Sequence, residues 1–232
     1  MQPEPSSFDA KVRRPGLAWL AAKKIPPAQK LAPKQTIQPY WRHCLDELHE
    51  RYDGVCAYLS VFMERCTGGV SVDHFVVKSR KAGLAYEWSN YRLACATMNS
   101  RKRDFEDVLD PFSLTPETFH LELVTGRIYP NPALVAHDRE AARATIDRLS
   151  LDDAGCREMR ARRYQEYREH NLTSEYLKKQ SPFVLSVVPL DALEVRLQHL
   201  AHRQLTGGGE VDQLAARIEE ELTRVKAQLP AQ

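Results

Sequence analysis

The sequence predicts an α+β fold in which a small core of two strands and a helix follows an extended N-terminal arm and precedes a largely helical C-terminal region. Prolines and basic residues alternate through the first 39 residues, and short β-type segments are concentrated between residues 55 and 130. From residue 131 onward, apolar residues recur at helical spacing. We therefore divide the chain into an arm (1–39), a core (40–130) and a helical region (131–232).

Composition and charge narrow the classes of function. The 232 residues are 43% hydrophobic, as in an ordinary globular protein, and no apolar run approaches the roughly 20 residues needed to cross a bilayer. We expect a cytoplasmic protein without membrane insertion, whose five cysteines stay as thiols. Residues 1–103 hold 17 Lys and Arg against 9 Asp and Glu, a balance of +8, whereas the remainder carries −6. Such asymmetry favours a polyanionic partner near the N-terminal half, although ordinary solvated charge is the alternative.

The arm and the segment after it each have one predicted helix. A short helix is possible from Gly16 to Lys24, and Pro26 and Pro27, which follow it, would end it. The arm could lie along DNA or simply wrap the domain. A second helix is predicted over Tyr40–Tyr52, which has apolar residues on one face and is followed by a turn at Asp53 and Gly54.

The core should then form two short strands over Val55–Tyr58 and Gly69–Val76. From about Ser89 the pattern becomes helical, with Tyr91 and Met98 on one face. Beyond the core the same reasoning predicts a β-hairpin, two long helices and a terminal helical hairpin. These cover, in order, Phe119–Tyr129, about Asn131–Leu149, about Asp152–His170 and Leu190–Val225.

Polar residues of the core suggest the chemistry of phosphodiester hydrolysis, which needs an activated water and a cation to offset charge on the phosphate. Asp73 and His74 are adjacent, so both can reach one site only where the strand ends. His74 is the candidate general base, because a neutral imidazole accepts a proton near neutral pH. Asp73 and the amide oxygen of Asn99 are candidate ligands of Mg²⁺ or Mn²⁺, and Asn90 could brace the loop behind His74.

Basic residues around this set are candidates for contacting the DNA backbone. Lys102 follows Asn99 by three positions, so on a helix the two share a face. The full set of predicted phosphate-binding residues is Lys102, Lys78, Arg80, Arg92 and Arg101.

Together these residues resemble the HNH endonuclease family, whose ββα-metal motif carries Asp/His-His on the first strand hairpin, Asn in the connecting loop and His or Asn on the helix. The matching positions are Asp73-His74, Asn90 and Asn99, and Asn99-Ser-Arg-Lys102 is similar to the Asn-x-x-Lys of RNA-guided nucleases. The resemblance covers about residues 55–112. It implies a ββα-metal core, with His74 as the base, Asp73 and Asn99 as metal ligands and Asn90 as the structural asparagine.

The sequence departs from the family in one respect. Many bacterial members carry two CxxC pairs for a structural zinc, but here the second positions are Leu59 and Met98, after Cys56 and Cys95. We therefore expect an apolar cluster in place of a zinc site. The flanks are also similar to stand-alone HNH proteins of bacterial phage defence, including the HNH subunit of type II Zorya systems, which implies other defence components as partners. The supporting segments include the arm motif 11–16, Trp88–Leu93 and Leu109–Phe112.

The leading hypothesis is a metal-dependent DNA endonuclease that nicks or cleaves DNA. Two alternatives remain open: a catalytically silent DNA-binding or adaptor subunit, favoured by the basic half and the leucine-rich C-terminal segment, and an RNase or toxin built on the same motif. The sequence indicates neither a preferred DNA sequence nor an oligomeric state.

Overall fold

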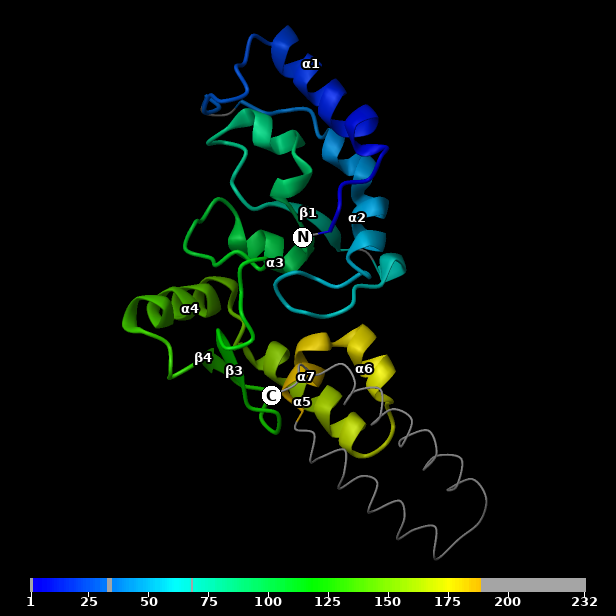
Figure 1. Ribbon diagram of the computed structural model, residues 1–232, viewed down its shortest axis with the longest axis vertical. Helices are drawn as coiled ribbons and strands as arrows, with labels where there is room; N and C mark the ends of the chain where they lie inside the picture. Colours follow the sequence, from blue (N-terminus) through cyan, green and yellow to red (C-terminus); the bar gives the residue numbers. More distant parts are fainter. Residues whose placement is uncertain (1, 33–34, 68, 189–232) are drawn as a thin grey trace, which may run out of the picture.

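The computed structural model describes residues 2–32, 35–67 and 69–188, which form a mixed α+β structure (Figure 1). The predicted α+β class is thus confirmed. Two antiparallel two-stranded sheets, β1–β2 and β3–β4, are joined by helices within these ranges. The elements are α1 (Arg14–Ala22), α2 (Leu45–Arg51), β1 (Val70–His74), β2 (Tyr91–Cys95), α3 (Ala96–Lys102), β3 (Phe119–Leu121), β4 (Ile128–Pro130), α4 (Ala136–Leu149), α5 (Ala154–Arg168), α6 (Ser174–Gln180) and α7 (Pro182–Val187).

Two clusters of buried apolar side chains hold these elements together. The larger one joins α1, α2, the β1–β2 sheet and α3, and its fully buried members include Leu20, Leu48 and Leu93. Burying each such side chain contributes about 1.5–3 kcal/mol relative to leaving it in water. The smaller cluster lies among β3 and helices α5 to α7, in the lower half of Figure 1. The candidate site belongs to the half built on the larger cluster.

The N-terminal segment contributes to the core, whereas the sequence predicted an arm that either lies along DNA or wraps the domain. A π-helical turn over Asp9–Arg13 continues directly into α1, so the helix begins before the expected Gly16. Phe8, Val12 and Leu20 are fully buried and recur at intervals of four or eight residues, which places them on one helical face. Gly16 completes this face, because a Cβ there would lie only 2.3 Å from the ring of Tyr86.

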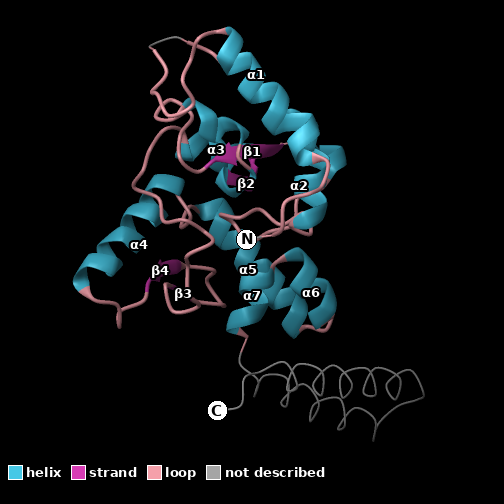
Figure 2. Ribbon diagram, turned by 45° about the horizontal axis from the view of Figure 1, so that its top comes forward, coloured by secondary structure: helices cyan, strands magenta, loops and turns pink. Residues whose placement is uncertain are grey.

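β2 corrects the helix expected from about Ser89. Residues Tyr91–Cys95 form a strand that pairs antiparallel with β1, and α3 begins only at Ala96. The sequence showed no alternation because Tyr91, Arg92, Leu93 and Ala94 are all buried, so both faces of the strand are covered. The strand predicted over Val55–Tyr58 is reduced to a single bridge between Val55 and Phe62. In Figure 2, β1 and β2 lie between α3 and α2.

Up to α5 the second half follows the predicted order with one shifted boundary, whereas the short helices α6 and α7 were not predicted. The hairpin of β3 and β4 turns at Gly126, whose φ is +68°. α4 begins at Ala136 and not at Asn131, because the Asn131 side chain accepts a hydrogen bond from the amide of Ala133 and forms a turn there. The predicted hairpin over 190–225 lies outside the described residues. No helix in the described ranges is long and apolar enough to cross a membrane.

Candidate active site

One cavity of about 540 Å³ brings together three of the four predicted catalytic and metal-binding residues, Asp73, His74 and Asn99. Asp73 and His74 are the last two residues of β1, and Asn99 lies on α3. α3 follows β2 directly and runs back along β1, so Asn99 comes beside Ser71, and Lys102 comes beside the end of the strand. The short β1–β2–α3 unit thereby presents an acid, an imidazole and an amide to the same space.

The Asp73 carboxylate is almost completely buried and has two side-chain partners. The Tyr58 hydroxyl donates to Oδ2, and the ammonium of Lys102 lies 3.3 Å from Oδ1. Burial raises the pKa of Asp73, while the charge of Lys102 and the hydrogen bond from Tyr58 act in the opposite direction. Lys102 is only 1% exposed and also donates to the carbonyl oxygens of His74 and Phe75. Its ammonium is therefore bound to the end of β1.

His74 is held as a neutral imidazole with a defined orientation. Its Nε2 lies 3.2 Å from the carbonyl oxygen of Ala85, which can only accept, so Nε2 carries the proton and Nδ1 keeps its lone pair. The rings of Trp41 and Tyr91 meet it edge-on, at centroid distances of 4.7 and 5.2 Å. Burial, together with the nearby charge of Lys78, lowers the pKa of His74 to about 3.

The buried neutral imidazole predicts a specific dependence of stability on pH. Between about pH 6.5 and pH 3 the unfolded chain binds a proton at His74 that the folded chain does not, so the free energy of unfolding falls as pH is lowered. At pH 5 the loss from this residue should be about 2 kcal/mol. Urea unfolding of the wild type and His74→Gln at pH 7 and pH 5 measures it. The stability advantage of the wild type should shrink by that amount, and parallel pH dependences would contradict a neutral His74.

The two asparagines have different surroundings. Asn90 is buried and makes three hydrogen bonds with backbone groups of the loop between β1 and β2: it accepts from the amide of Val76 and donates to the carbonyls of Val76 and Leu84. It thus braces the loop that follows His74. Asn99 donates a hydrogen bond through Nδ2 to Ser71 Oγ at 3.1 Å. This bond does not use the side-chain oxygen of Asn99. Asn99 is partly exposed and lines the cavity.

The five predicted phosphate-binding cations fall into two groups. Lys78 is exposed and lines the cavity, with its ammonium 5.2 Å from the Trp41 ring centroid, and Arg80 is exposed but paired with Glu106. Arg92, Arg101 and Lys102 instead bind groups of the protein itself. Arg92 is buried, forms a bidentate pair with Asp110 and stacks on the Phe112 ring. Arg101 donates to the carbonyl of Leu149 and to Asp153.

Four residues of the site were not predicted from the sequence to have a functional role. Trp41 and Arg42 come from a 3₁₀ turn before α2, and Arg103 lies just beyond α3; all three line the cavity. Tyr58 reaches Asp73 from the segment before β1. Arg103 immediately follows Arg101-Lys102 and offered a signal in the sequence. Tyr58 and Trp41 offered none, because only the fold brings them to the strand end.

The donor set fits a hard divalent cation that keeps most of its waters. Among the described residues, no group of three or more His, Cys, Asp or Glu side chains is arranged to hold a metal ion. Asp73, with its carboxylate, and Asn99, with its amide, line the same cavity as His74. Carboxylate and carbonyl oxygens are the ligands Mg²⁺ and Mn²⁺ prefer, and each oxygen of Asp73 retains a lone pair after its present hydrogen bond.

The corner formed by Cys56, Leu59, Cys95 and Met98 is packed with apolar and thiol groups. Cys56 and Met98 are each 1% exposed, and the half-buried Leu59 and Cys95 pack against the same core cluster. The amide of Cys95 donates to the Cys56 sulfur at 3.4 Å. These contacts tie the segment before β1 to the junction of β2 and α3.

Comparison with known proteins adds no family assignment to this geometry. Neither a protein-family model nor a curated protein matches the sequence.

Proposed function

We propose that the chain is a metal-dependent DNA endonuclease of the HNH type. The observation that carries the proposal is the meeting of Asp73, His74 and Asn99 in one cavity, from the end of one strand and the helix that runs back along it. The order of two antiparallel strands and a helix also supports it, since the family's motif has that order. The resemblance of the flanking residues extends the proposal to a role in bacterial defence against phages.

Each residue takes a role that its contacts support. His74 is the general base, because Nδ1 is unprotonated and the imidazole lines the cavity. Asp73 and Asn99 would hold Mg²⁺ or Mn²⁺, which, when bound, offsets the negative charge of the phosphate. Asn90 positions the loop behind His74. Lys102 and Tyr58 are positioning residues that hold the Asp73 carboxylate, a different role from the phosphate contact first expected of Lys102.

The proposal predicts metal-dependent conversion of supercoiled plasmid to nicked or linear DNA. Activity should require Mg²⁺ or Mn²⁺ and be absent in EDTA. Asn99→Ala should raise the metal concentration for half-maximal rate by about tenfold, because the site loses one oxygen ligand. Ser100→Ala is the matched control, since Ser100 is exposed on the same helix and does not line the cavity. Equal cleavage in EDTA would contradict the proposal, as would equal effects of the two substitutions.

One observation favours a second candidate, a catalytically silent DNA-binding subunit. Both oxygens of Asp73 already have protein partners, and the buried ammonium of Lys102 supplies the charge that a metal ion would otherwise provide. Such a subunit would bind DNA but leave plasmid intact with every divalent metal. The plasmid assay, run alongside a binding assay in EDTA, separates the two candidates.

A further inference from the structure

A second cavity, of about 580 Å³, adjoins the candidate active site and shares Lys78 and Asp104 with it. Its other wall is the N-terminal segment around Lys30 and Leu31. Backbone hydrogen bonds hold that segment against the loop between β1 and β2. Leu31 donates to Ser79 at 2.9 Å, Ala82 to Gln29 at 3.0 Å and Gly83 to Pro27 at 2.8 Å. The second cavity is therefore part of the folded surface.

Positive charge predominates along the two cavities. Arg42, Lys78 and Arg103 line the first cavity, and Lys30 and Lys78 line the second; all four are exposed. Within the described part of the chain, none of the four forms an ion pair, whereas Arg80 nearby is paired with Glu106. We call these four residues the basic track.

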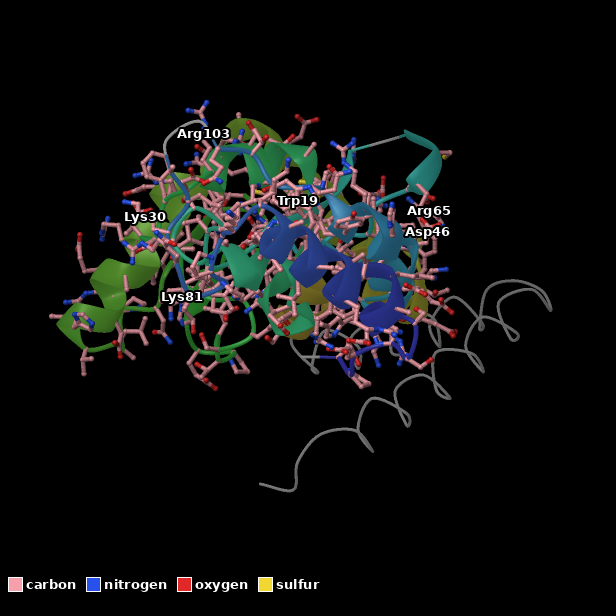
Figure 3. The ribbon with its side chains drawn as sticks, turned by 90° about the horizontal axis from the view of Figure 1, so that it is seen from above. Trp19, Lys30, Asp46, Arg65, Lys81 and Arg103 are labelled. Atoms are coloured by element: carbon pink, nitrogen blue, oxygen red, sulfur yellow. The ribbon has the colours of Figure 1, made fainter. Side chains whose placement is uncertain are left out.

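Carboxylates offset the charge of the basic track only in part. Asp73 is already compensated by Lys102, which leaves the exposed Asp104 as the other acid lining either cavity. Figure 3 shows Lys30 and Arg103 well apart from Asp46 and Arg65, which pair with each other on the other side of the molecule. Within the two cavities, the four exposed cations therefore outnumber the one exposed carboxylate.

We propose that the basic track binds one continuous DNA strand, with the phosphate to be cleaved in the first cavity and a neighbouring phosphate of that strand in the second. This inference rests on the proposed function and adds the path of the substrate. Lys78 is the cation shared by both cavities, so it contacts the backbone between the two phosphates. The N-terminal segment then has both roles considered for it: it packs on the domain, and through Lys30 it lines the DNA path.

Salt dependence of DNA binding tests the basic track without relying on catalysis. Binding of a fluorescent DNA duplex is measured by anisotropy in EDTA across a series of NaCl concentrations, where cleavage is excluded. A cation that contacts phosphate contributes about 0.9 to the slope of log K against log salt for duplex DNA. Lys30→Ala and Lys78→Ala should each weaken binding and lower the slope by about 1, and the double variant by about 2.

Lys23→Ala is the matched control, because Lys23 is an exposed lysine of the same N-terminal segment that lines neither cavity. Its slope should stay at the wild-type value. A loss for Lys23→Ala equal to that of Lys30→Ala would overturn the basic track, since binding would then follow total charge. Unchanged binding in the Lys30 and Lys78 variants would overturn it as well. If the lysine variants bind DNA like the wild type while the wild type still cleaves plasmid, the basic track is wrong and the proposed nuclease function stands. If the slopes fall as expected but no plasmid is cleaved, the basic track stands and the nuclease function is wrong.

Discussion

Replacing His74 with alanine should reduce the rate of plasmid nicking by a factor of about 10² to 10⁴, the usual contribution of a positioned general base. His74 lines the cavity, and its Nδ1 is unprotonated because the proton on Nε2 is engaged by the carbonyl of Ala85. No other histidine lines this cavity among the described residues. The substitution therefore removes the proposed proton acceptor and leaves Asp73 and Asn99 in the sequence.

Two further variants separate catalysis from folding. His74→Gln keeps a polar side chain of similar size and should be equally inactive, while circular dichroism confirms that the variant is folded. His43→Ala is the control, because His43 is exposed on the same turn as Trp41 and does not line the cavity. Added imidazole should restore part of the activity of His74→Ala. Nicking at the wild-type rate in both His74 variants would remove His74 as the base.

Much of the candidate site could be predicted from local sequence. Asp73 and His74 end a short β-type segment, and their adjacency itself requires a strand end if both are to reach one space. Asn99 was also correctly expected on a helix. The strand that brings this helix back beside β1 was not expected, because the helical pattern was predicted to begin at about Ser89.

The remainder depends on packing that no local pattern records. β2 is buried on both faces and shows no alternation, so the helical interval between Tyr91 and Met98 was a coincidence. Spacing placed Lys102 on the same face of α3 as Asn99 but could not show that its ammonium turns inward to Asp73. Likewise, Pro15 was read as part of an extended arm, although it stands at the start of α1, where proline is tolerated. The helix was therefore predicted only from Gly16, and the burial of Phe8 and Val12 before it was missed.

The buried pair of Lys102 and Asp73 leads to the largest expected effect on stability. Lys102→Met should lower the free energy of unfolding by about 3–5 kcal/mol, because it leaves the buried carboxylate of Asp73 without its compensating charge. Methionine roughly preserves the length and apolar stem of lysine, so the effect should come mainly from the lost ammonium. Urea unfolding at pH 7 measures the change. Lys81→Met, at an exposed position outside the cavity, should cost less than about 0.5 kcal/mol.

A double-mutant cycle then tests whether the loss arises from the pair. Asp73→Asn removes the charge that Lys102→Met leaves uncompensated, so the double variant should be more stable than Lys102→Met alone. If Lys102→Met and Lys81→Met lower the free energy of unfolding by the same amount, the buried pair makes no measurable contribution to stability. The same double variant should fold and yet fail to cleave plasmid, because the charged ligand proposed for the metal is gone. Stability that returns in the double variant would assign the loss in Lys102→Met to the uncompensated carboxylate of Asp73.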